Sequence, residues 1–278
     1  MTTERPVRVT IPDLRRMKSP PSAAHPQQRI VAVTAYDYTF ARLLDQCGVD
    51  ILLVGDSLGM VIHGADNTLA VTLDDMIYHA RAVARAAQRA MVICDLPFGA
   101  FQCHPEAALT SAIRVLKESG SHAVKIEGGR IMAETVRFLV ARGVPVIGHI
   151  GLTPQSVHAM GGFRMQGRDQ ASASRLLEDA RVLDEAGASI IVLEGIPMPL
   201  AQQITQTVQA VTIGIGAGPG CDGQVLVLYD LLGLDERFQP RFVKRYMDGA
   251  HQVRQAVMAF ADEVRKGTFP APEHTVME

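Results

Sequence analysis

Four carboxylates, one lysine and one histidine stand near the ends of short apolar runs in this sequence, where they could act together on a small molecule. The six residues are Asp56, Asp95, Lys125, Glu127, His149 and Glu194. Each has an ordinary explanation when taken alone, because an acid after a strand often caps the next helix and a buried histidine can be a hydrogen-bonded core residue. Helix caps have no reason to converge on one place, so the set indicates a site if the fold brings all six together.

The excess of carboxylates favours a hard cation with oxygen ligands. The sequence contains no His-x-His and no Cys-x-x-Cys pair, which disfavours zinc. Mg²⁺ is the first choice, because it takes one or two carboxylates and leaves its other positions to water and substrate oxygens. Such an ion could polarise the keto and carboxylate oxygens of a 2-keto acid, while a separate carboxylate removes a proton from the neighbouring carbon. The residue types therefore predict metal-assisted enolate formation.

Short β-branched runs alternate with Ala- and Arg-rich helical patterns, and these elements would position the six residues. We expect strands over residues 29–36, 50–57, 90–97, 122–129, 145–152, 189–196, 211–218 and near 224–233. Helices are predicted between them at 40–48, 73–88, 105–120, 132–143, 173–187 and 199–208. This alternation predicts a parallel sheet covered on both faces, and it fits a (β/α)8 TIM barrel, with an open doubly wound sheet as the alternative. In a barrel, the carboxyl ends of the strands form one rim where the six residues meet.

Composition and length place the chain among ordinary globular proteins. Hydrophobic residues make up 47% and charged residues 20%, and the formal net charge is −2. This balance disfavours a nucleic-acid partner, no apolar segment reaches the roughly 20 residues of a membrane span, and the cysteine pattern predicts a cytoplasmic setting without disulfides. We expect a single catalytic domain over residues 1–278, with an N-terminal arm or cap at 1–28, the barrel at 29–270 and a tail at 271–278.

Seven longer motifs carry a resemblance to a known family. They are TAYDYTFARLLD (34–45), LVGDSLGMVIHGADNTLAVTLDDMIYH (53–79), DLPFGAF (95–101), VKIEGG (124–129), GHIGLTPQSVHAMGGFRMQGR (148–168), LEGIP (193–197) and GIGAGPGCDGQVLVLYDLLGL (214–234). The sequence thereby resembles the ketopantoate hydroxymethyltransferases, also called 3-methyl-2-oxobutanoate hydroxymethyltransferases, over essentially residues 29–270. The departures concern Gly195 and the segment before residue 29, and no catalytic position of the motifs is replaced.

The resemblance implies a fold, a reaction and an assembly. The fold would be a (β/α)8 barrel of the phosphoenolpyruvate/pyruvate type. The reaction would move a one-carbon unit from 5,10-methylenetetrahydrofolate to 2-oxoisovalerate (3-methyl-2-oxobutanoate), which gives ketopantoate (2-dehydropantoate) for pantothenate and coenzyme A synthesis. Members of the family use Mg²⁺ and commonly form homodecamers, so both are expected here.

The resemblance also implies roles for residues in the matching motifs. Asp56 and Asp95 would ligate the metal and contact the substrate, and Glu127 would hold the metal directly or through water. Ser57 would bind the substrate carboxylate, and Lys125 would pair with the keto acid.

Three further residues are placed in the site by the same resemblance. Glu194 would be the proton acceptor, and His149 would contact the incoming hydroxymethyl group. Tyr36 is a weaker candidate for lining the pocket.

Three other interpretations stay open at this point. The nearest is a Mg²⁺-dependent carbon–carbon lyase or mutase on the same barrel. The second is a Schiff-base aldolase using Lys125, which is weakened because Glu127 on the same strand face should favour a protonated lysine. The third is a non-catalytic module that binds keto acids, although binding alone does not require a spare base.

Overall fold

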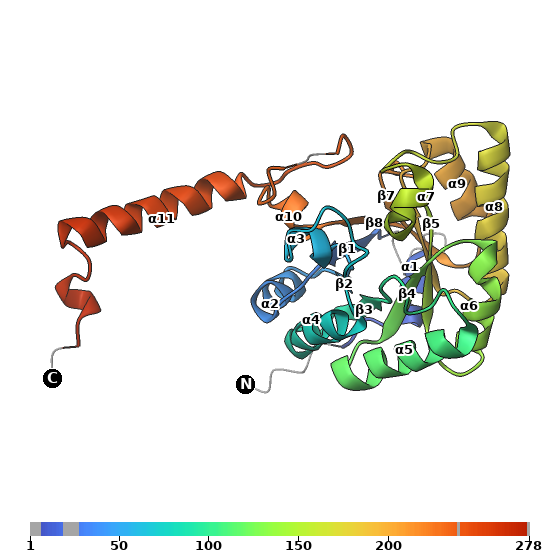
Figure 1. The fold of residues 1–278 in the computed structure, drawn as a ribbon, viewed down its shortest axis with the longest axis horizontal. Helices are drawn as coiled ribbons and strands as arrows, with labels where there is room; N and C mark the ends of the chain where they lie inside the picture. The colour runs from blue at the N-terminus through green and yellow to red at the C-terminus, as the bar shows by residue number, and fades with distance from the viewer. Residues whose placement is uncertain (1–6, 19–27, 238–239, 277–278) are drawn as a thin grey trace. The chain divides into compact units, whose positions relative to one another are not determined.

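The computed structural model describes residues 7–18, 28–237 and 240–276, and its eight strands form a closed parallel β-barrel (Figure 1). Its strands pair in chain order: β1 (Ile30–Thr34), β2 (Ile51–Val54), β3 (Met91–Asp95), β4 (Ala123–Glu127), β5 (Val146–Gly151), β6 (Ile190–Glu194), β7 (Val211–Ile215) and β8 (Gly223–Leu226). The strand β8 pairs with β1 and closes the barrel. The predicted (β/α)8 barrel is confirmed, and the open doubly wound sheet is wrong.

Helices connect successive strands and cover the outside of the barrel (Figure 1). The longer ones are α2 (Tyr38–Gln46), α4 (Leu73–Ala86), α5 (Pro105–Ser119), α6 (Ala133–Val140), α8 (Gln170–Glu185) and α9 (Met198–Thr207). Shorter ones lie on loops that follow strands: α3 (Leu58–Val61), η1 (Arg130–Met132), η2 (Pro154–Ser156) and α7 (Val157–Met160). Local sequence sets the helix ends, since Thr72 begins α4 with a capping box and Gly120, at φ +81°, ends α5.

Successive side chains of each strand point alternately into the barrel interior and outward, toward the helices. One apolar core fills the interior and the amino ends of the strands: Leu14, Ile30, Ala32, Ile51, Met91, Ile93, Ala123, Ile147, Ile190, Val192, Val211, Ile213 and Val225. Because side chains alternate with a period of two, residues two positions further along these strands also point inward. The apolar core therefore continues directly into the polar residues at the carboxyl ends.

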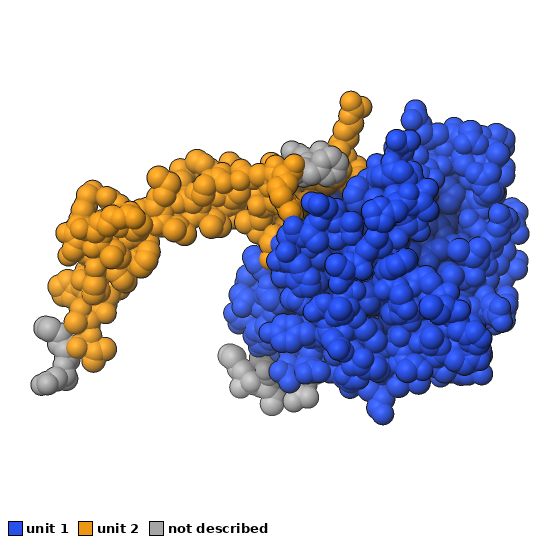
Figure 2. Space-filling view, viewed as in Figure 1, with its two compact units in different colours: residues 1–227 blue, residues 228–278 orange. Residues whose placement is uncertain are grey.

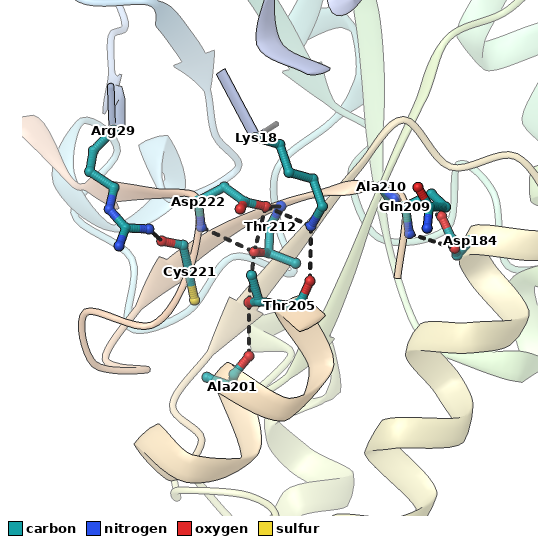
Figure 3. Close-up of polar contacts among 10 residues, drawn as sticks. All are labelled: Lys18, Arg29, Asp184, Ala201, Thr205, Gln209, Ala210, Thr212, Cys221 and Asp222. Atoms are coloured by element: carbon teal, nitrogen blue, oxygen red, sulfur yellow. Dashed lines mark hydrogen bonds and ion pairs between the residues drawn. The ribbon is translucent and has the colours of Figure 1, made fainter. Parts of the chain in front are cut away.

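The helix α1 (Ile11–Lys18) lies against the amino ends of the strands and belongs to the same core. Leu14 is fully buried there. Lys18 Nζ donates to Thr205 O at 3.0 Å and to Asp222 Oδ2 at 2.9 Å, and the same carboxylate oxygen accepts from the backbone N–H of Thr212 at 2.8 Å (Figure 3). Residues 19–27, where the expected arm continues, lie outside the described residues.

The chain divides into two compact units, residues 1–227 and 228–278, coloured separately in Figure 2. The first contains the whole barrel. The second contains α10 (Leu228–Leu231), α11 (Gly249–Lys266) and η3 (Pro272–His274). The eighth strand ends at Leu226, so the apolar run expected near 224–233 is split between a strand and a helix.

The long helix α11 was not expected from the sequence. Its exposed apolar side chains include Val253, Val257, Phe260 and Val264. Among the described residues, no helix combines the length and apolar character needed to span a membrane.

We predict that Asp222→Ala destabilises the barrel. The substitution leaves the Lys18 ammonium and the Thr212 N–H, both largely buried, without their shared acceptor, and such a loss costs about 3 kcal/mol. Urea unfolding of the wild type and of Asp222→Ala measures the difference in the free energy of unfolding. The matched control is Asp74→Ala, which removes an ion pair of similar length, 2.8 Å to Arg114, from an exposed site and should change little. Equal effects of the two substitutions would contradict the prediction.

Candidate active site

Strand register brings five of the six residues to the carboxyl end of the barrel. Each of the five lies two or four positions beyond an inward-facing core residue of its strand, so its side chain also faces inward. They are Asp95, Lys125, Glu127, His149 and Glu194. In the parallel pairing, Asp95 lies beside Lys125 and Glu127 lies beside His149. The convergence of these residues follows from the alternation within strands and from the closure of the sheet.

The ammonium of Lys125 lies at the centre of this group. Its Nζ is 3.1 Å from Asp95 Oδ2 and 3.3 Å from His149 Nδ1. His149 lies in turn between two carboxylates, with Nδ1 3.7 Å from Glu127 Oε1 and Nε2 3.2 Å from Glu194 Oε2. Lys125 and His149 together therefore connect residues from β3, β4, β5 and β6.

The first two strands contribute residues from their loops. Asp56, just after β2, is buried, and its backbone N–H donates to Asp95 Oδ2 at 3.1 Å. Ser57 precedes α3, and its Oγ is 2.9 Å from the hydroxyl of Tyr36, which is buried after β1. All the residues singled out from the sequence thus lie at the same rim.

Gln155 is a member of this group that the sequence analysis did not identify. It is buried in η2, and its side-chain Nε2 donates to Asp56 Oδ2 at 2.8 Å and to Leu96 O at 3.0 Å. Its backbone N–H donates to Glu127 Oε2 at 2.9 Å. Gln102, in the loop after β3, donates to Gln155 Oε1 at 2.9 Å. Nothing in composition or spacing distinguishes Gln155 from other glutamines, although its motif was part of the resemblance.

A glycine makes the turn toward Gln155 possible. Gly151, the last residue of β5, has φ +96°, and a Cβ at this position would lie 2.2 Å from Glu194 O. That carbonyl accepts from the N–H of Leu152 at 2.8 Å. Only glycine combines this backbone conformation with so close an approach of two chains.

The carboxylates are held away from water, and this changes their acidity. Burial raises the pKa of Asp95 to about 7, although Lys125 opposes the shift. Burial likewise raises the pKa of Asp56 and Glu127 above their ordinary values. Burial alone would lower the pKa of Lys125, but Asp95, Glu127 and Asp56 outweigh it and raise that pKa. The lysine is therefore protonated at neutral pH.

His149 is neutral in this environment, because burial and the neighbouring Lys125 both lower its pKa. Lys125 can only donate, so His149 Nδ1 accepts and Nε2 carries the ring proton. Nε2 faces Glu194 at hydrogen-bond distance, but the ring N–H is not aligned with the carboxylate oxygen. The Glu194 side chain is 16% exposed, against 3% for Asp95, so it is the more accessible carboxylate.

Two buried carboxylate oxygens suit a cation. Asp95 Oδ1 and Glu127 Oε1 have no hydrogen-bond partner within the part of the chain that the structure describes. Across those same residues, no three or more His, Cys, Asp or Glu side chains form a group that could hold a metal ion. The donor set fits Mg²⁺, which commonly keeps water or substrate oxygens in its remaining positions.

The fold and site define a barrel enzyme with a carboxylate-rich rim, and comparisons with known proteins identify its family. A family model described as ketopantoate hydroxymethyltransferase matches residues 8–272. The chain is 58% identical over 268 residues to the 3-methyl-2-oxobutanoate hydroxymethyltransferase of Magnetococcus marinus, covering 96% of this chain and 98% of that protein. The chain therefore belongs to the ketopantoate hydroxymethyltransferase family, as the resemblance implied.

Solved structures with the same barrel are more distant in sequence. A 2,3-dimethylmalate lyase, described as a PEP mutase/isocitrate lyase superfamily member, has a TM-score of 0.56 at 19% identity and covers 96% of this chain and 91% of its own. A phosphonopyruvate hydrolase in complex with oxalate and Mg²⁺ has a TM-score of 0.56 at 13% identity, with 89% and 88% covered. These similarities concern the fold alone: the chain has the same kind of barrel as these proteins.

The raised pKa of Asp95 predicts a pH-dependent stability of the metal-free protein. Its pKa rises from an ordinary 3.8 to about 7 on folding, so its contribution is fully present below 3.8 and is lost as the pH rises through about 7. Between pH 5 and 8 this one group should lower the free energy of unfolding by about 2–3 kcal/mol. Urea unfolding after chelation of metals measures the change. Asp95→Asn should lose less stability over the same interval, and parallel curves for the two proteins would contradict the assignment.

Proposed function

We propose that this enzyme transfers a hydroxymethyl unit from 5,10-methylenetetrahydrofolate to 3-methyl-2-oxobutanoate, forming 2-dehydropantoate through a metal-stabilised enolate. Membership of the family supports the reaction. The observation that supports the mechanism is a division among the carboxylates. Asp95 and Glu127 are buried, and each has one oxygen without a hydrogen-bond partner among the residues that the structure describes, whereas Glu194 is more accessible. This division separates residues suited to holding a cation from one suited to moving a proton.

The metal would be held by the carboxylates at the ends of β2, β3 and β4. Asp56 and Asp95 would be its ligands, with Glu127 binding directly or through water. When bound, Mg²⁺ would supply Lewis-acid polarisation of the keto and carboxylate oxygens of the keto acid.

The acid–base step belongs to Glu194. Its carboxylate takes the proton from C3 of the keto acid, and the electron pair of that C–H bond remains on the substrate as the enolate. His149 Nε2 lies 3.2 Å from Glu194 Oε2, close enough to orient this carboxylate once the ring N–H turns toward it in the substrate complex. The methylene carbon then leaves both folate nitrogens and forms one bond to C3 and one to the oxygen of water, which becomes the hydroxyl group. The proton that Glu194 took from C3 and one proton of the water end on the two folate nitrogens, so the folate leaves as tetrahydrofolate.

Lys125 and Ser57 hold the keto acid during these steps. The ammonium of Lys125 lies at the buried end of the site and pairs with the negative charge of the keto acid, and Ser57 binds its carboxylate. Holding the substrate against rotation keeps C3 toward Glu194, which is a positioning contribution to the rate.

A Schiff-base reaction is less well supported by the environment of Lys125. A lysine must be neutral to attack a carbonyl, but three carboxylates raise the pKa of Lys125 above its ordinary value. The lyases and hydrolases of similar fold share less than 25% identity with this chain and support only the barrel. Homodecameric assembly and a cytoplasmic setting stay predictions from the resemblance.

Proton exchange without folate tests the proposal. We expect the protein with Mg²⁺ and 3-methyl-2-oxobutanoate in heavy water to exchange the C3 proton, as followed by NMR. Glu194→Gln should abolish the exchange because the amide cannot accept the proton, while the keto acid still binds. The matched control is Glu185→Gln, on the exposed end of α8, which should exchange like the wild type.

Two outcomes would overturn parts of the proposal. Absence of both exchange and folate-dependent product formation in the wild type would refute the assigned reaction. A covalent adduct of Lys125 trapped by borohydride would replace the enolate mechanism with the Schiff-base alternative.

A further inference from the structure

Gln155 makes hydrogen bonds to several parts of the site, which its place in a short helix does not by itself explain. Its two amide hydrogens go to Asp56 Oδ2 and Leu96 O, and its amide oxygen accepts from Gln102. Its backbone N–H goes to Glu127 Oε2. One residue in the loop after β5 therefore contacts two carboxylates that come from the ends of β2 and β4.

The amide of Gln155 can adopt only one orientation in this environment. Exchanging its oxygen and nitrogen would place the oxygen against Asp56 Oδ2 and Leu96 O, which are both acceptors. It would also place the NH₂ group against the NH₂ group of Gln102. Gln102 is oriented in the same way, because its own oxygen accepts from Gly99 N–H at 2.7 Å. The two glutamines thus form a chain of hydrogen bonds with a fixed direction that ends on Asp56.

This chain determines how the carboxylates can meet a cation. Each of Asp56 and Glu127 has one oxygen held by Gln155, which removes the free rotation of the carboxylate. For Glu127, the other oxygen, Oε1, is buried and has no hydrogen-bond partner among the described residues. A carboxylate fixed through one oxygen can offer the other without first losing rotational freedom, so the metal site is arranged before the ion arrives.

We propose that Gln155 is a positioning residue for the metal site: its amide, oriented by Gln102, fixes the carboxylate of Asp56, and its backbone N–H fixes that of Glu127. This inference rests on the proposed function, which places the metal on these carboxylates. It adds a residue that acts on the metal through its ligands and that touches neither the keto acid nor the reacting carbon in the proposed mechanism.

Binding of Mn²⁺ to the metal-free, full-length protein tests the inference, with free Mn²⁺ followed by electron paramagnetic resonance. Gln155→Met keeps the length of the side chain and the backbone N–H but removes the amide. We expect Mn²⁺ to bind about 10- to 100-fold more weakly, as is typical when a residue that orients a ligand is lost. Gln166→Met is the matched control, since its amide donates to Arg164 O, and it should bind Mn²⁺ like the wild type.

A double-mutant cycle with Gln102 separates positioning from general damage to the fold. Gln102→Met should weaken Mn²⁺ binding by a smaller factor, about threefold or more, and it should add nothing to Gln155→Met because Gln102 acts through Gln155. Additive effects, or wild-type binding by a folded Gln155→Met protein, would overturn the inference. If Gln155→Met does not fold, Gln102→Met decides the question: a Gln102→Met protein that binds Mn²⁺ as tightly as the wild type overturns the inference.

The outcomes distinguish this inference from the proposed function. Unchanged Mn²⁺ binding in the variants, together with C3 exchange by the wild type, refutes the role of Gln155 and leaves the reaction standing. Loss of Mn²⁺ affinity in Gln155→Met, together with no exchange by the wild type, supports the positioning role and refutes the reaction. A wild-type protein that binds no Mn²⁺ would overturn both the metal assignment and the role of Gln155.

Discussion

In the part of the chain that the structure describes, the buried carboxylates are organised around the positive charge of the Lys125 ammonium. It lies 3.1 Å from Asp95 and 3.3 Å from His149. It stabilises the buried acids, and together with burial it lowers the pKa of the histidine and keeps that ring neutral. One cation does not neutralise Asp56, Asp95 and Glu127 together. Burial is the main cause of their raised pKa values, and repulsion from neighbouring carboxylates adds to it. The site thus keeps an excess of negative charge in a place that water reaches poorly, a condition that a divalent cation relieves.

The barrel can hold this charge because one end supplies stability and the other end carries the polar site. The amino end is closed by α1, with Leu14 in the apolar core and Lys18 bound to Asp222 (Figure 3). The apolar interior between the ends contributes stability through burial and contains few groups that could pair with the acids above it. Stability and chemistry are therefore assigned to opposite ends of the same strands, so the carboxyl end can tolerate unfavourable electrostatics.

Much of this arrangement could be predicted from the sequence, because its causes are local. The first seven strands lie within the apolar runs expected for them, and the period of two along each run directs Lys125 and Glu127 to the same face. Gln155 could not be found in this way, since its bond to Asp56 joins residues 99 positions apart through a turn whose path depends on the closed barrel. The helix α11 did leave a signal, the spacing of Val253, Val257, Phe260 and Val264, but it follows the last strand and falls outside the alternation used to place the other helices.

Gly151 has no side chain, yet it affects the positions of both Glu194 and Gln155. Its missing Cβ leaves room for the carbonyl of Glu194, and its positive φ turns the chain toward Gln155. Any other residue would displace the backbone beside the proposed base and, through the same turn, the glutamine that contacts Asp56 and Glu127. In a survey of all single substitutions, position 151 would therefore be as intolerant as a catalytic position although it carries no functional group. Such a survey would group Gly151 with the catalytic acids. It would not reveal that the position matters because no side chain fits there.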